Sequence, residues 1–98
     1  MSEATVEKAP GRIAVGGEMT IYAAAELKDE LFPLVQAADQ RLTIDLSGVT
    51  ALDTAGLQLL IMLKRIAKQS GIGCEMVKPS HAVLDVLNLC GLDALLAP

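Results

Sequence analysis

The chain is 98 residues long, which suits one small domain and is too short for two independent cores. Of these residues 52% are hydrophobic, so the chain can fill a core and does not fit the disordered class. Eight basic and twelve acidic residues give a net charge of −4, and the only aromatic residues are one Tyr and one Phe. This composition excludes a basic, aromatic-lined nucleic-acid surface, and the expected partner is a protein.

The cysteines, the N-terminal residues and the apolar runs indicate the cellular location of the protein. Cys74 and Cys90 are too few for a disulfide framework and lack metal-site spacing, so we expect both to be reduced. Residues 1–5 have neither the basic nor the apolar part of a signal peptide, and we expect residues 1–4 to be disordered. The longest apolar run, 59–63, is too short to cross a bilayer. We therefore expect a cytoplasmic protein that does not insert into a membrane.

The first elements are expected to form a hairpin. Residues 6–8 and 12–15 are strand-like, and the Pro10-Gly11 pair between them supplies a preset φ and a tolerated positive φ for a tight turn. The next two glycines, Gly16-Gly17, are expected to end the second strand.

A helix with Thr20 as its cap is expected to follow. Its apolar side chains recur at helical spacing and are Leu27, Leu31, Leu34, Val35 and Ala38. Pro33 lacks a backbone donor and crowds the preceding turn, so we expect this helix to bend or break near residues 29–32.

The next segment decides the architecture. Residues 42–46 alternate apolar and polar side chains with a period of two, as a strand does when one face is buried and the other meets water. A sheet covered on both faces would have a continuous apolar run here. Helices are therefore expected to cover mainly one face of the sheet.

The rest of the chain alternates helix and strand. The expected elements are a loop over 47–53, a helix over 54–69, a strand over 74–78, a helix that opens at Pro79-Ser80 and ends at Gly91, and one more helical turn within 92–98. The residues of the last long helix expected to face the core are Val83, Leu84, Leu87 and Cys90. This order implies right-handed crossovers. We predict an α/β fold: a single domain over residues 1–98, with a mixed β-sheet, an opening hairpin and helices mainly on one face.

Few residues suggest catalysis, a metal or a cofactor. His81 is the single histidine and stands beside an expected helix start, which favours a surface position over a catalytic relay or metal centre. The glycines form no phosphate-binding loop pattern. Asp45 and Asp53 flank the same strand and loop, but nothing in the sequence indicates a pocket for them. We expect no enzyme activity, no cofactor and no metal site.

The informative stretch is 44–57, where a strand leads through a polar segment into a helix. The first turn of that helix has unpaired N–H groups and a partial positive charge. Two interpretations use this property. Asp53 or Thr54 is an N-cap that contributes about 1 kcal/mol, or Thr54 carries a phosphate at the helix N-terminus. Spacing alone favours the cap.

Several short motifs follow one another in a definite order. They are Gly17-Glu18, Asp53-Thr54-Ala55-Gly56-Leu57 after an alternating strand, Gly71 after an apolar helix, Pro79-Ser80, and Cys90-Gly91-Leu92 at the end of a helix. This order and spacing, over roughly residues 11–96, resembles the STAS domain family, the bacterial anti-sigma factor antagonists.

The resemblance implies a phosphorylation switch. In the family, the hydroxyl residue of a D-[ST]-x-G loop accepts phosphate from a partner kinase that is also an anti-sigma factor, and Thr54 occupies that position. The unmodified form binds the partner, the phosphorylated form releases it, and a phosphatase restores Thr54. The chain departs from many kinase-regulated members in having Thr54 in place of Ser, Ala55 in place of a second hydroxyl, and Met19-Thr20 where they have an acid.

The outer face of the helix over 54–69 is a candidate docking surface. Ile61 and Met62 are interpreted either as the edge of a wide core stripe, which we favour slightly, or as the apolar centre of a docking surface. In the second case Lys64, Arg65 and Lys68 form a basic rim. We expect the contact to include the loop 50–54, and the predicted partner-binding residues are Asp53, Thr54, Ala55, Gly56, Gln58, Ile61, Met62 and Arg65.

Two other roles fit the same resemblance. Some STAS domains are permanent accessory subunits docked on the ATPase of a phospholipid-transport ABC system, where Thr54 would be an interface contact. Others are adaptors associated with chemotaxis. We predict the first role, an anti-sigma factor antagonist with Thr54 as phospho-acceptor, and keep these two as alternatives.

Overall fold

The computed structural model describes residues 3–97, and its chain starts with the predicted hairpin. Strand β1 (Thr5–Ala9) pairs antiparallel with β2 (Arg12–Met19), and Gly11 in the turn between them has a φ of +71°. The Pro10-Gly11 turn is therefore confirmed. The expectation of a disordered start falls partly on residues 1 and 2, which lie outside the described residues.

Strand β2 is longer than predicted. Gly16 and Gly17 lie within it, so the prediction that they end the strand was wrong. Gly17 has a φ of +80°, and a Cβ at this position would lie 1.9 Å from the carbonyl oxygen of Glu3. A residue without a side chain therefore lets the segment before β1 pass close to β2 while the strand continues.

Two parallel strands complete the sheet. Strand β3 (Arg41–Leu52) pairs with β2, strand β4 (Gly73–Val77) pairs with β3, and the order is β1-β2-β3-β4. The alternating segment 42–46 lies in β3 as predicted, but the loop expected over 47–53 was wrong, because residues 47–52 continue the strand. They stay in the sheet because the second half of β2 pairs with them through two register shifts.

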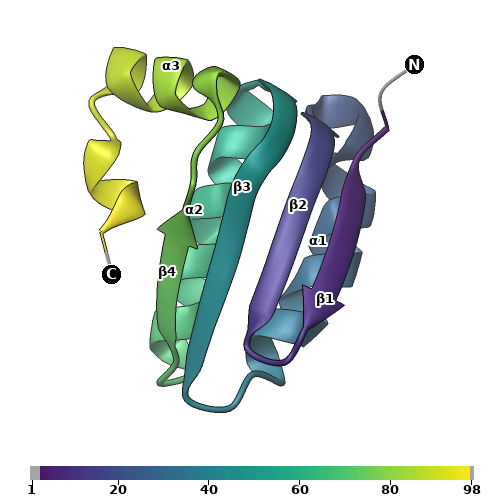
Figure 1. Ribbon diagram of the computed structural model, residues 1–98, viewed down its shortest axis with the longest axis vertical. Helices are drawn as coiled ribbons and strands as arrows, with labels where there is room; N and C mark the ends of the chain where they lie inside the picture. The colour runs from purple at the N-terminus through teal and green to yellow at the C-terminus, as the bar shows by residue number, and fades with distance from the viewer. Residues whose placement is uncertain (1–2, 98) are drawn as a thin grey trace.

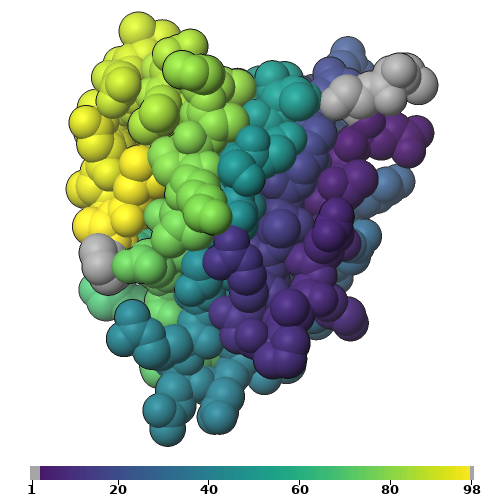
Figure 2. Space-filling view, viewed as in Figure 1, coloured from purple at the N-terminus to yellow at the C-terminus, as the bar shows by residue number. Residues whose placement is uncertain are grey.

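The helices lie mainly on one side of this sheet. Helices α1 (Ile21–Gln36) and α2 (Thr54–Gln69) run behind the strands in Figure 1. Helix α3 (His81–Cys90) and a short 3₁₀ helix, η1 (Asp93–Leu96), follow β4 at the edge of the sheet. Figure 2 views the opposite face, where side chains of the strands meet solvent. The predicted mixed sheet with helices mainly on one face is confirmed.

The core fills the space between the sheet and the helices. Its largest fully buried side chains are Met19, Leu31, Ile44, Leu46, Leu60, Leu63, Met76, Leu87, Val15, Val35, Val49 and Val83. Pro33 does not break α1, which continues through it to Gln36. The proline is exposed and lies in the last turn, where it removes one backbone hydrogen bond, the one that an N–H at this position would donate to the carbonyl of Asp29.

Helix α3 begins and ends as its sequence predicts. The Ser80 hydroxyl accepts a hydrogen bond from the Val83 N–H (3.3 Å), and Gly91 closes the helix in the left-handed conformation with a φ of +67°. Cys90 was expected to face the core, but it is exposed, because the last turn of α3 from Asn88 onward lies outside the packed core. Cys74 is buried in β4, and both thiols are free.

Candidate functional site

Asp53 stands between β3 and α2 and caps two helices at once. Its Oδ1 accepts a hydrogen bond from the Gly56 N–H of α2 (3.0 Å), and its Oδ2 accepts one from the Ile21 N–H of α1 (2.8 Å). Thr20 occupies the cap position of α1, but its side chain makes no capping hydrogen bond. The cap interpretation of Asp53 is therefore confirmed, and Asp53 replaces the cap that Thr20 was expected to provide.

The same contacts determine the charge of Asp53. The Gly56 N–H lowers the pKa of the Asp53 carboxyl most, partial burial acts in the opposite direction, and the Ile21 N–H lowers the pKa further. The carboxylate is therefore ionised at neutral pH, at the positive ends of two helices.

The contacts of Gly56 explain why the D-T-A-G motif has a glycine at this position. A Cβ at this position would lie 2.1 Å from the carbonyl oxygen of Met19 and 2.7 Å from a methyl group of Leu52. The absence of a side chain therefore lets α2 begin directly against the end of β2. Gly56 is buried, so it shapes the predicted partner-binding surface from beneath, whereas Ala55 is half-buried.

Thr54 is the first residue of α2 and is exposed. Its hydroxyl has no hydrogen-bond partner among residues 3–97. The position agrees with the expectation of an accessible hydroxyl at a helix N-terminus, where N–H groups and the helix dipole favour an anion. The loop expected over 50–54 is much shorter, because residues 50–52 belong to β3 and only Asp53 separates the strand from the helix.

The outer face of α2 continues from Thr54 along the helix. Gln58 and Arg65 are exposed and lie within about 40° of Thr54 around the helix axis, given 3.6 residues per turn. Ile61 and Met62 flank this line and are half-buried, and Ile61 packs against the core. Ile61 is thus at the edge of the core stripe, yet both side chains keep surface that a partner could cover.

Lys64 does not belong to the basic rim predicted for this face. Its Nζ donates a hydrogen bond to the carbonyl oxygen of Cys74 (2.9 Å) and another to that of Ala97. Lys64 therefore joins α2 to β4 and to the C-terminal segment, and the rim is reduced to Arg65 and Lys68, which are both exposed.

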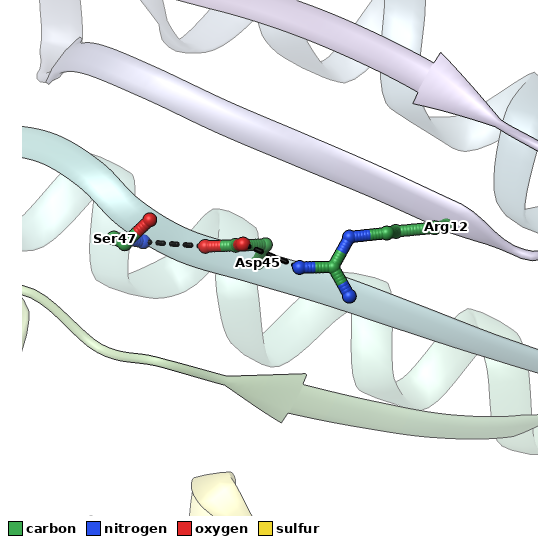
Figure 3. A network of polar contacts seen from close by, with 3 residues as sticks. All are labelled: Arg12, Asp45 and Ser47. Atoms are coloured by element: carbon green, nitrogen blue, oxygen red, sulfur yellow. Dashed lines mark hydrogen bonds and ion pairs between the residues drawn. The ribbon is translucent and has the colours of Figure 1, made fainter.

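Asp45 belongs to a separate polar network on β3, drawn in Figure 3. Its Oδ2 forms an ion pair with the Arg12 guanidinium of β2 (2.5 Å), and its Oδ1 accepts a hydrogen bond from the Ser47 N–H (2.8 Å). Ser47, through its N–H and its hydroxyl, lowers the pKa of Asp45 most, burial opposes this, and Arg12 lowers it further. Asp45 and Asp53 thus have different partners and do not form a pair of carboxylates.

The remaining candidates for chemistry are dispersed. His81 is exposed at the first residue of α3. Residues 3–97 contain no group of three or more His, Cys, Asp or Glu side chains placed to hold a metal ion. Over the same residues, no helix has the length and apolar character needed to span a bilayer.

Two residues near the site were not singled out from the sequence. Ile21 and Tyr22 start α1 next to the Asp53 cap, and they are 67% and 95% exposed. Their spacing could have indicated their exposure. Ile21 and Tyr22 do not fall on the helical repeat of the apolar stripe that starts at Leu27, so they are not expected to face the core.

Known proteins share this sequence pattern. A family model described as Mlab, STAS domain matches residues 3–97. The anti-sigma-B factor antagonist of Bacillus subtilis (strain 168) is 28% identical over 82 residues, which are 83% of this chain and 73% of that protein. By its name, this relative is an antagonist of an anti-sigma factor.

Solved structures share the fold. An anti-sigma factor antagonist from Mycobacterium paratuberculosis has a TM-score of 0.73 at 27% identity, over 99% of this chain and 84% of that chain. The anti-sigma factor antagonist SpoIIAA in its unphosphorylated form has a TM-score of 0.71 at 17% identity, over 92% and 82% of the two chains, and its phosphorylated form has 0.68 at 16%, over 92% and 85%. The SpoIIAA likeness concerns the fold alone. Because the family model matches all of the described residues, 3–97, this chain belongs to the STAS domain family.

Proposed function

We propose that this protein is an anti-sigma factor antagonist that binds an anti-sigma factor through Thr54 and the outer face of α2, and that phosphorylation of Thr54 releases this partner. The observation that carries the proposal is the exposed hydroxyl of Thr54 at the N-terminus of α2, one residue after the Asp53 cap. The relatives named as anti-sigma factor antagonists support the class of partner.

The proposed contact surface starts at the cap and follows α2. It consists of Asp53, Thr54, Ala55, Gln58, Ile61, Met62 and Arg65, with Gly56 beneath it. Ile61 and Met62 supply apolar surface halfway along the helix, and the exposed Gln58 and Arg65, about one turn before and one turn after them, supply polar contacts. An apolar centre with a polar rim is the usual composition of a protein interface.

A phosphate on Thr54 affects the free and the bound protein differently. In the free protein, the N–H groups and partial positive charge at the start of α2 accommodate the added charge of about −1.5 to −2. In the complex, the phosphate would lose water beside the Asp53 carboxylate and against a surface that fits a hydroxyl. A difference of only about 1.4 kcal/mol weakens binding tenfold. SpoIIAA, which has the same fold, has been solved in both forms, which supports a switch that keeps the fold.

In this scheme the chain is a substrate and a binding partner. The anti-sigma factor acts as the serine/threonine kinase and supplies ATP, and a separate phosphatase restores the Thr54 hydroxyl. Because sigma factors act on RNA polymerase inside the bacterial cell, the proposal implies a cytoplasmic location.

Three variants test the proposal. Thr54→Ala removes the acceptor, Thr54→Glu adds a negative charge, and Thr5→Ala, which removes an exposed hydroxyl from β1, is the matched control. In pull-downs from the native host, wild type, Thr54→Ala and Thr5→Ala are expected to retain a protein with a kinase-type ATP-binding domain, and Thr54→Glu is expected to lose it. Incubation with ATP should then phosphorylate wild type and Thr5→Ala but not Thr54→Ala.

Two outcomes contradict the switch. Recovery of a transporter ATPase that binds Thr54→Glu as well as wild type would favour the accessory-subunit role. Unchanged binding by every variant, with only the thermal stability altered, would leave Thr54 as a structural residue of the helix start.

A further inference from the structure

Three large hydrophobic side chains are strongly exposed among the described residues, and two of them are neighbours at the start of α1. Ile21 is 67% exposed and Tyr22 is 95% exposed, while the third, Leu89, is 88% exposed on α3. Single apolar side chains on a surface are ordinary, but adjacent ones beside other interface residues indicate surface that a partner removes from water.

Ile21 and Tyr22 are continuous with the surface proposed for the partner. The Ile21 N–H donates to Asp53 Oδ2 at 2.8 Å, and Thr54 follows Asp53 directly. The starts of α1 and α2 therefore lie side by side, and the two exposed side chains extend the surface around Thr54 toward α1.

A groove of about 400 Å³ opens next to Tyr22, between the segment before β1 and the first turns of α1. Tyr22 and Leu27 line it together with the carboxylates of Glu18, Glu26 and Glu30, and its described lining residues include no lysine or arginine. The nearby cation on α1, Lys28, has its Nζ 5.5 Å from the centre of the Phe32 ring. The groove therefore combines an exposed aromatic ring with several carboxylates and no basic side chain among its described lining residues.

We propose that this groove, together with Ile21 and Tyr22, receives a basic segment of the partner in which arginine residues are mixed with apolar ones. This inference rests on the proposed function, because it assigns the groove to the same partner that contacts Thr54. An arginine fits because its planar guanidinium stacks on a tyrosine ring and donates to carboxylates at the same time. Its apolar neighbours would cover Ile21.

The groove and Thr54 then have different roles in binding. Opposite charges at the groove attract and orient the partner, and this attraction weakens as salt is added. A phosphate on Thr54 has the same sign as the groove, so it does not repel a basic segment, and release comes from the buried contact at Thr54 itself. The groove is therefore expected to bind a basic peptide even when Thr54 carries a negative charge.

An NMR titration of the ¹⁵N-labelled protein tests this with two synthetic peptides of about twelve residues, one alternating leucine with arginine and one alternating leucine with glutamine. The arginine peptide is expected to shift the amide signals of residues 21–27, in wild type and in Thr54→Glu alike. Its affinity should fall about tenfold in Tyr22→Ala and in the double variant Glu26→Gln/Glu30→Gln. Asp85→Asn, which removes an exposed carboxylate from α3, is the matched control and should bind within about twofold of wild type.

Three results would overturn the assignment: shifts spread evenly over all acidic surfaces, undiminished binding by the double variant, or equal binding of the glutamine peptide at residues 21–27. Because Tyr22, Glu26 and Glu30 are exposed, their variants should keep the thermal midpoint of wild type, which excludes unfolding as a cause.

A second measurement separates this inference from the proposed function, with the purified anti-sigma factor recovered through the Thr54 variants as the probe. Tenfold weaker binding by Tyr22→Ala and by the double variant supports the groove. If Thr54→Glu abolishes binding while the groove variants bind like wild type, the groove assignment is wrong and the switch stands. If the arginine peptide shifts the signals of residues 21–27, but no kinase-type partner binds differently to the Thr54 variants, the switch is wrong and the site for a basic segment stands.

Discussion

The backbone N–H of Ile21 donates a 2.8 Å hydrogen bond to the carboxylate of Asp53, which lies 32 residues later in the chain. The other oxygen of the same carboxylate caps α2 through Gly56, and the Asp53 N–H donates to the carbonyl oxygen of Met19 at the end of β2 (3.3 Å). One side chain thus fixes the starts of α1 and α2 relative to the sheet, directly beside the exposed Thr54.

Replacement of Asp53 should destabilise the protein more than loss of an ordinary cap. Asp53→Ala leaves donors of two helices without their acceptor, and we expect the free energy of unfolding to fall by about 1–3 kcal/mol in urea titrations. Asp53→Asn keeps an acceptor oxygen and should lose less. Asp85→Ala, at an exposed position of α3, serves as the control. An effect of Asp53→Ala no larger than that of the control would contradict the double cap.

Gly56→Ala should be strongly destabilising. Its Cβ would lie 2.1 Å from the backbone oxygen of Met19, so α2 would have to move away from β2, at a cost of about 2–4 kcal/mol. Gly73→Ala is the matched control, because a Cβ there meets its neighbours only at 3.8 Å. Thermal unfolding of both variants measures the difference. Equal midpoints for the two would show that the start of α2 adjusts freely.

The network around Asp45 should make stability depend on acid pH. The Ser47 N–H, assisted by the Ser47 hydroxyl and Arg12, holds the pKa of Asp45 below the value of about 3.9 for an unfolded chain. A lowered pKa stabilises the fold above the unfolded pKa, and this contribution is lost as the pH falls through the folded pKa. Between about pH 6 and about pH 3, the free energy of unfolding should therefore fall more steeply for wild type than for Asp45→Asn.

Denaturant titrations at several pH values measure this difference, and Asp85→Asn is expected to follow the wild-type curve. Parallel curves for wild type and Asp45→Asn would mean that the Asp45 contacts do not favour the ionised carboxyl in the folded protein.

The two cysteines should react at very different rates. Cys90 is exposed, whereas Cys74 is buried in β4, and burial raises the pKa of the Cys74 thiol although Lys64 acts in the opposite direction. Only the thiolate is nucleophilic, so an aromatic disulfide reagent should label Cys90 rapidly and Cys74 only after unfolding. Cys90→Ser should abolish the rapid phase. A rapid phase that survives in Cys90→Ser would contradict the burial of Cys74.

Features that depend on a few neighbouring residues were predictable. The bounds of the helix over 54–69, the Ser80 cap and the left-handed Gly91 follow from helical periodicity and from capping chemistry within one or two turns. The exposed position of Thr54 followed in the same way. The face of the sheet covered by helices was also predictable, because alternation along 42–46 requires one apolar face.

Predictions from neighbouring residues were wrong where contacts with segments distant in the sequence determine the position of a residue. Gly16-Gly17 was predicted to end its strand because glycine is unfavourable in strands. Pairing with residues 48 and 49 of β3 keeps both glycines in the sheet. Lys64 was predicted to be part of a basic surface rim, because the sequence shows only its position along α2. Its hydrogen bonds go to backbone carbonyls of β4 and of the C-terminal segment, which only the folded chain brings to it.

By itself, the amino-acid order determined that this chain forms a mixed α/β layer and that a threonine begins its second helix, since periodicity and capping act over short distances. Tertiary structure alone decided that Asp53 serves two helices, that Gly56 must lack a side chain, and that Ile21 and Tyr22 stand exposed next to Thr54. Each of these features depends on atoms that come together only when β2 and β3 pair and bring the starts of α1 and α2 to the same end of the sheet.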